Sequence, residues 1–199
     1  MESEARCNLC GAGRFSPVEE SYPPYRALRC AECGLIFVSP QPARAQLVAS
    51  YGEEYYKGWR DLRPRARRRM WERRLWQLES RLPAWLADRP ARGELLDVGC
   101  GTGAFLEAAR RRGWKIAGTE ISPEAARAAS RLLGVEVFCG ELASARLESD
   151  RFDLVTLWHV LEHVADPSAT LSECARVLSP GGVMVVAVPN VESRVFNLA

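Results

Sequence analysis

Glu94-Leu-Leu-Asp-Val-Gly-Cys-Gly-Thr-Gly103 is the stretch that decides the fold of this chain. A short apolar run leads into three glycines at alternate positions, Gly99, Gly101 and Gly103, and a helix-forming pattern follows over 104–112. A strand that ends in such glycines and turns directly into a helix lets the backbone approach a ligand closely, with the helix N-terminus behind it. The stretch therefore predicts a nucleotide-binding turn.

The spacing of these glycines separates two kinds of nucleotide site. A dinucleotide-binding fingerprint has two residues between its second and third glycines, whereas only Thr102 stands between Gly101 and Gly103. A diphosphate ligand, and with it nicotinamide-dependent reduction, is therefore disfavoured.

The segment 97–103 resembles motif I of class I S-adenosylmethionine-dependent methyltransferases. In that family the turn packs against the adenosyl and methionine parts of the cofactor, neither of which carries a phosphate. The resemblance implies that the following residues of the turn hold the cofactor: Asp97, Gly99, Cys100, Gly101 and Gly103.

The next two predicted strands, 114–120 and 135–139, supply the rest of the expected cofactor site. Glu120 ends the first of them, about 20 residues beyond the glycine turn, where an acid can accept hydrogen bonds from both ribose hydroxyls. Ile121 would then lie against the adenine ring. The resemblance further implies that Glu141 and Leu142, which follow the second strand, meet the adenine amino group.

A fourth strand over 152–159 and a fifth over 183–188 complete the pattern, with a helix capped by Asp166 between them. Five β/α units predict an α/β fold, a doubly wound, Rossmann-like and mostly parallel sheet with helices on both faces. The resemblance covers 94–190. It implies two further strands, which the nine residues after Asn190 cannot supply, so the apolar fifth strand could be an open edge through which two copies pair.

His159 and His163 are the only histidines in the chain and follow the fourth strand. The cofactor's methyl is already activated by a sulfonium cation, so the enzyme must align a nucleophile and remove its proton. A near-neutral imidazole can take that proton from a hydroxyl, or it can only shape the pocket. Both histidines are catalytic candidates, and the neighbouring Trp158 is a cofactor-binding candidate.

Two Cys-x-x-Cys-Gly turns precede this core, with 19 residues between them. Two such turns supply four thiolates in a tetrahedral arrangement, a spacing typical of structural zinc. No position is left for a catalytic water. The predicted ligands are Cys7, Cys10, Cys30 and Cys33, whereas Cys100, Cys139 and Cys174 fit core patterns as small apolar fillers.

The segment between the zinc ribbon and the core is predicted to be helical, with an apolar stripe that includes Trp71 and Leu75. Seven arginines lie over 63–74, and one of them, Arg68, falls close to the axis of the stripe, where it could face an anionic substrate group. A solvated face is the ordinary explanation for such a run. RNA phosphate binding is the alternative.

Composition limits the remaining choices. The chain has 199 residues, 47% of them hydrophobic, and a formal net charge of +2, which is too small to indicate nucleic acid or a membrane surface. It lacks an N-terminal apolar segment, which predicts a cytoplasmic protein. We expect a zinc ribbon over 1–42, a helical lid over 43–90 and a methyltransferase core over 91–199.

The function that these patterns favour is methyl transfer from S-adenosylmethionine to a small molecule, such as a sugar, a glycan precursor or a secondary metabolite. Two alternatives remain: an RNA methyltransferase that grips its substrate with the ribbon and the arginines, and a non-catalytic module that binds cofactor or a partner. The end of the fourth strand lacks the Asn-Pro-Pro-aromatic tetrad of amino-base methyltransferases, and no Pro-Cys nucleophile occurs. Both absences disfavour methylation of nucleic-acid bases.

Overall fold

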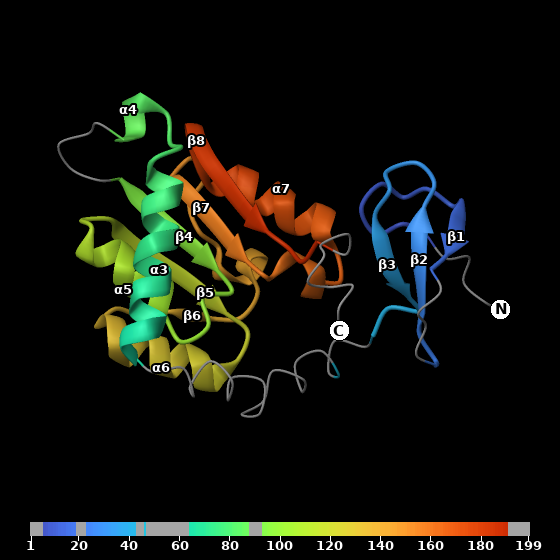
Figure 1. Ribbon diagram of the computed structural model, residues 1–199, viewed down its shortest axis with the longest axis horizontal. Coiled ribbons are helices and arrows are strands. Elements are labelled where there is room, and N and C mark those ends of the chain that lie inside the picture. Colours follow the sequence, from blue (N-terminus) through green and yellow to red (C-terminus); the bar gives the residue numbers. More distant parts are fainter. Residues whose placement is uncertain (1–5, 19–22, 43–45, 47–63, 88–92, 191–199) are drawn as a thin grey trace.

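The computed structural model describes residues 6–18, 23–42, 46, 64–87 and 93–190 (Figure 1). They form two sheets, a small antiparallel one near the N-terminus and a larger parallel one with helices packed on it. The predicted lid segment 43–90 lies partly outside the described residues.

The small sheet contains β1 (Phe15–Pro17), β2 (Arg26–Cys30) and β3 (Ile36–Ser39), each antiparallel to the next. Its core is minimal. Phe37 is buried and packs edge-on against Phe15, with the ring centroids 5.2 Å apart. A sheet of this size buries too little apolar surface to be stable alone, so a cross-link or a metal is needed to hold it.

The large sheet is parallel throughout and confirms the predicted doubly wound fold. Its strand order is β6-β5-β4-β7-β8. The strands are β4 (Glu94–Val98), β5 (Lys115–Glu120), β6 (Phe138–Cys139), β7 (Phe152–Trp158) and β8 (Leu178–Ala187). The chain moves outward from β4 through β5 to β6 and then returns to β7 on the other side of β4. This reversal opens a crevice beyond the carboxyl ends of β4 and β7.

Helices cover both faces of this sheet. The main ones are α3 (Pro64–Glu79), α5 (Ala104–Arg111), α6 (Pro123–Leu133) and α7 (Pro167–Val177), with shorter α4 (Ala84–Ala87), η1 (Leu142–Ala145) and η2 (Leu161–His163). The predicted cap at Asp166 is confirmed, and Ser122 caps α6 in the same way. The side chain of Ser122 accepts from Ala125 N–H, and that of Asp166 accepts from Ala169 N–H.

The two apolar cores follow from the alternation of side chains along each strand. Leu95 of β4 points to the face covered by α3, α5 and α6, whereas Leu96, the next residue, points to the face covered by η1 and α7. Both leucines are fully buried. A buried parallel strand must be apolar on both faces, which explains the continuous run of this part of the sequence.

A buried carboxylate fastens α3 to the rest of the domain. Glu79, at the end of α3, accepts from Arg112 Nε at 3.1 Å and from the indole N–H of Trp114 at 3.1 Å. Its side chain is only 6% exposed. Arg112 and Trp114 directly follow α5. Because both donate to the carboxylate at the end of α3, they hold α3 in a fixed position over α5.

The outer strands differ from the prediction. The third strand was expected over 135–139, but β6 has only two residues, and Cys139 on it is exposed instead of filling the core. β8 begins at Leu178, ahead of the predicted start at Val183, because the chain passes from α7 directly into the sheet. Among the described residues β8 is an open edge, as expected, and most of its side chains are half-buried.

No helix in the described part of the chain is both long and apolar enough to cross a lipid bilayer.

Candidate functional site

The glycine turn follows β4 and lies at the reversal of the sheet. Gly99, Gly101 and Gly103 all have positive φ, at 69°, 56° and 82°. The N–H groups of Gly99 and Cys100 both donate to Thr119 O on β5, at 2.8 and 3.0 Å. A side chain at Gly99 would meet the Val160 side chain at 2.5 Å, so glycine is required there for space as well as for conformation.

Gly103 has a packing role that its motif alone does not reveal. A Cβ added to it would lie 3.1–3.2 Å from atoms of Ala129 and Leu133, so this glycine lets α5 approach α6 closely. It is not among the residues that line the cavity described below. In the structure it starts α5 and packs that helix against α6, and its contact with a cofactor stays a prediction.

Glu120 holds the turn from the side of β5. Its carboxylate accepts from Gly101 N–H and from Ser122 N–H, each at 2.8 Å, and the residue is 3% exposed. A carboxylate has about four acceptor sites. Two backbone hydrogen bonds therefore fix the orientation of the Glu120 carboxylate beside the glycine turn.

Asp97, the last-but-one residue of β4, is buried with 2% exposure. Thr156 Oγ1 donates to Asp97 Oδ1 at 2.6 Å. Burial raises the pKa of Asp97 to about 8, the Thr156 hydrogen bond partly opposes this rise, and the nearby charge of Glu120 adds to it. A pKa of about 8 favours the protonated form of the Asp97 carboxyl at neutral pH.

These residues line a cavity of about 400 Å³ at the carboxyl ends of β4, β5 and β7. The volume lies within the range of small-molecule and cofactor sites. Every predicted cofactor and catalytic residue other than Gly103 contributes to the lining: Asp97, Gly99, Cys100, Gly101, Glu120, Ile121, Glu141, Leu142, Trp158, His159 and His163. Burial also raises the pKa of the Cys100 thiol, so that sulfur is not a nucleophile at neutral pH.

Sequence reasoning placed Trp158 at the site but missed the other two side chains of the aromatic wall of the cavity. Trp71 of α3, Phe105 of α5 and Trp158 of β7 contact one another in tilted and edge-on arrangements, with centroids 5.2–5.7 Å apart. Helical spacing identified Trp71 as a packing residue only. The signal that could have placed Trp71 at the cavity is its position on the sheet-facing side of a helix. A tryptophan there is large enough to pack in the core and line a pocket at the same time.

The two histidines lie on either side of Glu162, in the turn that follows β7. His159 Nδ1 is 3.3 Å from Glu162 Oε1, and His163 Nε2 is 4.0 Å from the same oxygen. His159 also has a positive φ of 56°, an uncommon backbone conformation for a residue with a side chain. With Nδ1 turned to the carboxylate, the other ring nitrogen of His159 remains as an acceptor.

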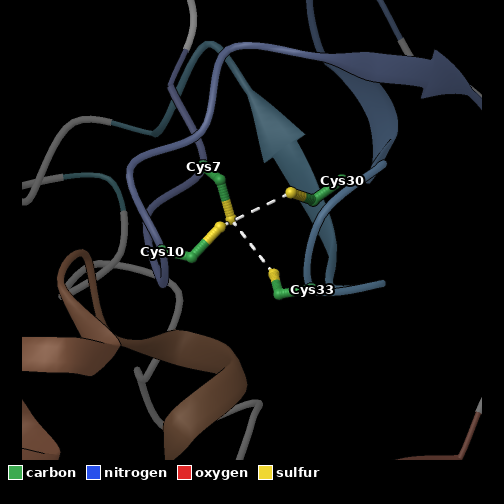
Figure 2. Close-up of side chains that lie close together, drawn as sticks. All are labelled: Cys7, Cys10, Cys30 and Cys33. Atoms are coloured by element: carbon green, nitrogen blue, oxygen red, sulfur yellow. Dashed lines mark hydrogen bonds between the residues drawn. The ribbon is translucent and has the colours of Figure 1, made fainter.

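The four N-terminal cysteines form a second site, outside the large sheet. Figure 2 shows their sulfurs converging from two turns. Cys7 Sγ lies 3.6 Å from Cys33 Sγ, Cys10 Sγ lies 3.6 Å from Cys30 Sγ, and all four lie within 4.8 Å of one another. A zinc ion with Zn–S bonds of about 2.3 Å needs sulfurs about 3.8 Å apart. The cluster is therefore compatible with a tetrahedral metal ion.

A doubly wound parallel sheet with a glycine turn and a buried acid around one cavity is the architecture of class I S-adenosylmethionine-dependent methyltransferases. The family described as "Methyltransferase domain" matches residues 66–198. The chain belongs to this family.

Curated relatives cover the same region. The ubiquinone biosynthesis O-methyltransferase of Hahella chejuensis is 38% identical over 114 residues, which are 53% of this chain and 47% of the relative. The enzyme of the same name from Xanthomonas axonopodis is 37% identical over 118 residues, 55% of this chain and 48% of the relative. The chain spans about half the length of the curated relatives it matches.

Solved structures share the fold. A protein of Thermotoga maritima, described as an S-adenosylmethionine-dependent methyltransferase and possible histamine N-methyltransferase, is 24% identical with a TM-score of 0.57, over 77% of this chain and 65% of its own. A protein of Pyrococcus horikoshii is 23% identical with a TM-score of 0.56, over 74% and 66%. At these identities the likeness extends to the fold alone.

Proposed function

We propose that this chain transfers a methyl group from S-adenosylmethionine to a small molecule. The observation that carries the proposal is the buried Glu120 carboxylate, fixed by Gly101 N–H beside the 400 Å³ cavity, where it can accept from the ribose of an adenosyl group. The curated relatives act in ubiquinone biosynthesis by their names, which supports a small-molecule acceptor.

The cofactor, when bound, supplies a methyl group activated by a sulfonium cation. The chain's own residues hold and orient it: the glycine turn gives close backbone approach, Glu120 accepts hydroxyls, and Ile121 and Leu142 provide apolar surface. His159 takes the proton of the acceptor as the methyl is transferred, because its Nδ1 faces Glu162 and its other nitrogen is available. Neither a covalent enzyme intermediate nor a metal is required at this cavity.

Replacement of His159 separates this role from a structural one. His159→Ala is expected to slow methyl transfer about 10²–10⁴-fold, the usual contribution of a positioned base. The affinity for S-adenosylhomocysteine should stay close to that of the wild type. His163→Ala, whose Nε2 is 4.0 Å from Glu162, should cost less and serves as the comparison. The measurement is transfer of labelled methyl to a panel of phenols and sugars.

Two results would contradict the proposal at different levels. Equal rates for the wild type and His159→Ala would remove the histidine as base. Cofactor binding without transfer to any member of the panel would favour a non-catalytic module instead.

The raised pKa of Asp97 leads us to expect that cofactor binding depends on pH. With a pKa of about 8, Asp97 is mostly protonated at pH 7 before the cofactor binds, and a bound sulfonium cation would stabilise the carboxylate and lower that pKa. Binding then releases a proton, so affinity rises with pH and levels off above about pH 8, by at most about tenfold per unit. Titration calorimetry between about pH 6 and 8 measures this.

The control for this linkage compares ligands and variants. S-adenosylhomocysteine, which lacks the sulfonium charge, should show a weaker pH dependence, and Asp97→Asn should show none from this group. Asp150→Asn, at an exposed acid outside the cavity, should behave as the wild type. A pH-independent affinity in the wild type would contradict the role of Asp97.

We also propose that the cysteine cluster binds one structural Zn²⁺. The four cysteines fill a tetrahedral coordination shell and leave no position for a substrate or a water. Ser168 Oγ at the start of α7 donates to Leu9 O within the first cysteine turn, at 2.6 Å. The metal would thus hold a small sheet that contacts the catalytic domain.

A further inference from the structure

A second cavity of about 470 Å³ adjoins the cofactor cavity and is lined by basic and apolar side chains. Its walls come from the C-terminal half of α3 and the turn after it, and from the ends of β7 and β8. The lining residues are Arg74, Gln77, Leu78, Arg81, Leu82, Trp158, His159, Val183, Val185 and Ala187. None of these described lining residues is acidic.

Two of the residues that line this cavity carry a buried donor atom without a partner among the described residues. Arg74 Nη1 and Trp158 Nε1 have no hydrogen-bond acceptor in that part of the chain, although both atoms are shielded from solvent. The guanidinium carbon of Arg74 lies 5.0 Å from the ring centroid of Trp71 and 5.8 Å from that of Trp158. Buried polar atoms are almost always paired, so these two N–H groups, on side chains that contact each other, point to an acceptor that the described residues do not supply.

The position of Arg74 corrects the prediction made for Arg68. Arg68 is exposed and its Nε lies 3.4 Å from Glu72 Oε1, one turn along the same helix. The cation of α3 that lies against the aromatic wall is Arg74, whose guanidinium carbon is over the Trp71 ring. A guanidinium that lies over aromatic rings keeps the N–H groups at its edge available. Arginine uses these N–H groups to bind a carboxylate or a phosphate in a bidentate manner.

This cavity meets the cofactor cavity at the end of β7. Trp158 and His159 line both of them. A molecule held by Arg74 would therefore extend toward His159, where the proton is removed under the proposed function. Its body would lie against Leu78, Val183 and Val185, three apolar side chains.

We propose that the second cavity is the acceptor subsite, that it takes a small organic anion with an apolar body, and that Arg74 and the Trp158 indole bind its carboxylate or phosphate. The assignment of this cavity as an acceptor subsite rests on the proposed methyl transfer. The binding of an anion by Arg74 and Trp158 does not depend on it. Carboxylate and phosphate share the feature that this site requires, which is an oxyanion with at least two oxygens that can face the two donors.

The test compares charged and neutral probes of one shape. Benzoate, phenyl phosphate and the neutral isostere benzamide are titrated by calorimetry at millimolar concentration into zinc-loaded protein saturated with S-adenosylhomocysteine. At least one anion should bind about tenfold or more tightly than benzamide, as expected for a charge-assisted pair of hydrogen bonds. The indole N–H resonance of Trp158, assigned with Trp158→Phe, should shift on binding. The stronger of the two anions identifies carboxylate or phosphate.

Arginine variants decide whether Arg74 is the anchor. Arg74→Gln should weaken anion binding about tenfold or more, Arg74→Lys should fall between Arg74→Gln and the wild type, and Arg73→Gln, at the exposed neighbouring position, should leave binding unchanged. All three should bind S-adenosylhomocysteine as the wild type does, which also reports that they are folded.

Three outcomes would overturn the inference: no binding by either anion, equal binding of benzoate and benzamide, or equal losses in Arg74→Gln and Arg73→Gln. Each of them leaves methyl transfer intact if S-adenosylhomocysteine still binds. Failure of the wild type to bind S-adenosylhomocysteine would instead refute the proposed function. The anion titrations, repeated without S-adenosylhomocysteine, would still test whether Arg74 binds the anion.

Discussion

Glu120→Ala is expected to bind S-adenosylhomocysteine about 10²–10³-fold more weakly than the wild type. The carboxylate has two jobs in the structure: it can accept ligand hydroxyls, and it accepts the N–H groups of Gly101 and Ser122 at 2.8 Å each. Hydrogen bonds to a charged group are worth about 1.5–3 kcal/mol, so the loss of two from the ligand, taken near the lower value, costs about 3–4 kcal/mol, or about 10²–10³-fold in affinity. Loosening of the turn adds to this loss.

Two further variants separate these contributions. Glu120→Gln keeps the shape and one acceptor oxygen and should fall between Glu120→Ala and the wild type. Glu124→Ala removes the same side chain from an exposed position in the first turn of α6 and should bind as the wild type does. Calorimetry measures all four proteins. Affinity of Glu120→Ala within a few-fold of the wild type would contradict both the ribose assignment and the proposed cofactor.

Much of the cofactor site could be predicted from the sequence because it is built from residues close in the chain or at strand ends. Gly99, Gly101 and Glu120 each follow an apolar run, and parallel strands bring their carboxyl ends to one edge of a sheet. The spacing of the motif therefore fixes their proximity in space. The place of Gly103 in the motif does not reveal that it packs closely against Ala129 and Leu133 of α6.

The second cavity could not be predicted, because it depends on how α3 is rotated and where it is placed. A helical wheel puts both Arg68 and Arg74 near the apolar stripe, within the uncertainty of its axis. Their difference comes from neighbours. Glu72 pairs with Arg68 at the surface, whereas the aromatic rings of Trp71 and Trp158 receive Arg74. Trp158 is distant in the sequence, so no local pattern contains this contact.

Sheet position likewise limits what an apolar pattern says about burial. The run 183–188 is as apolar as a central strand, yet β8 is the outer strand of the described sheet and Val186 is 39% exposed. Cys139 was taken as a core residue from a similar pattern and is exposed on the short β6. Hydrophobicity predicts that a segment is a strand more reliably than it predicts how many neighbours that strand has.

Chelation of zinc is expected to unfold the N-terminal sheet and leave the large sheet folded. The small sheet has three buried side chains, and two of them, Cys7 and Cys30, are themselves predicted ligands. Binding of zinc to such cysteine sets contributes about 10–16 kcal/mol, far more than this core can supply. Hydrogen exchange should therefore lose its protection in β2 and β3 after treatment with a chelator, while β4 and β7 keep theirs because their burial is independent of the metal.

Metal content and cysteine variants complete this test. One zinc per chain should be measured in the wild type, and Cys7→Ser should lose both the metal and the protection of β2. Cys139→Ser, which changes an exposed cysteine outside the cluster, should retain both. Protection of β2 and β3 that survives chelation, or a wild-type protein without bound zinc that still shows it, would mean that the four sulfurs stabilise the sheet by packing alone. Because Leu9 O accepts from Ser168 Oγ, loss of the metal should also raise exchange at the start of α7.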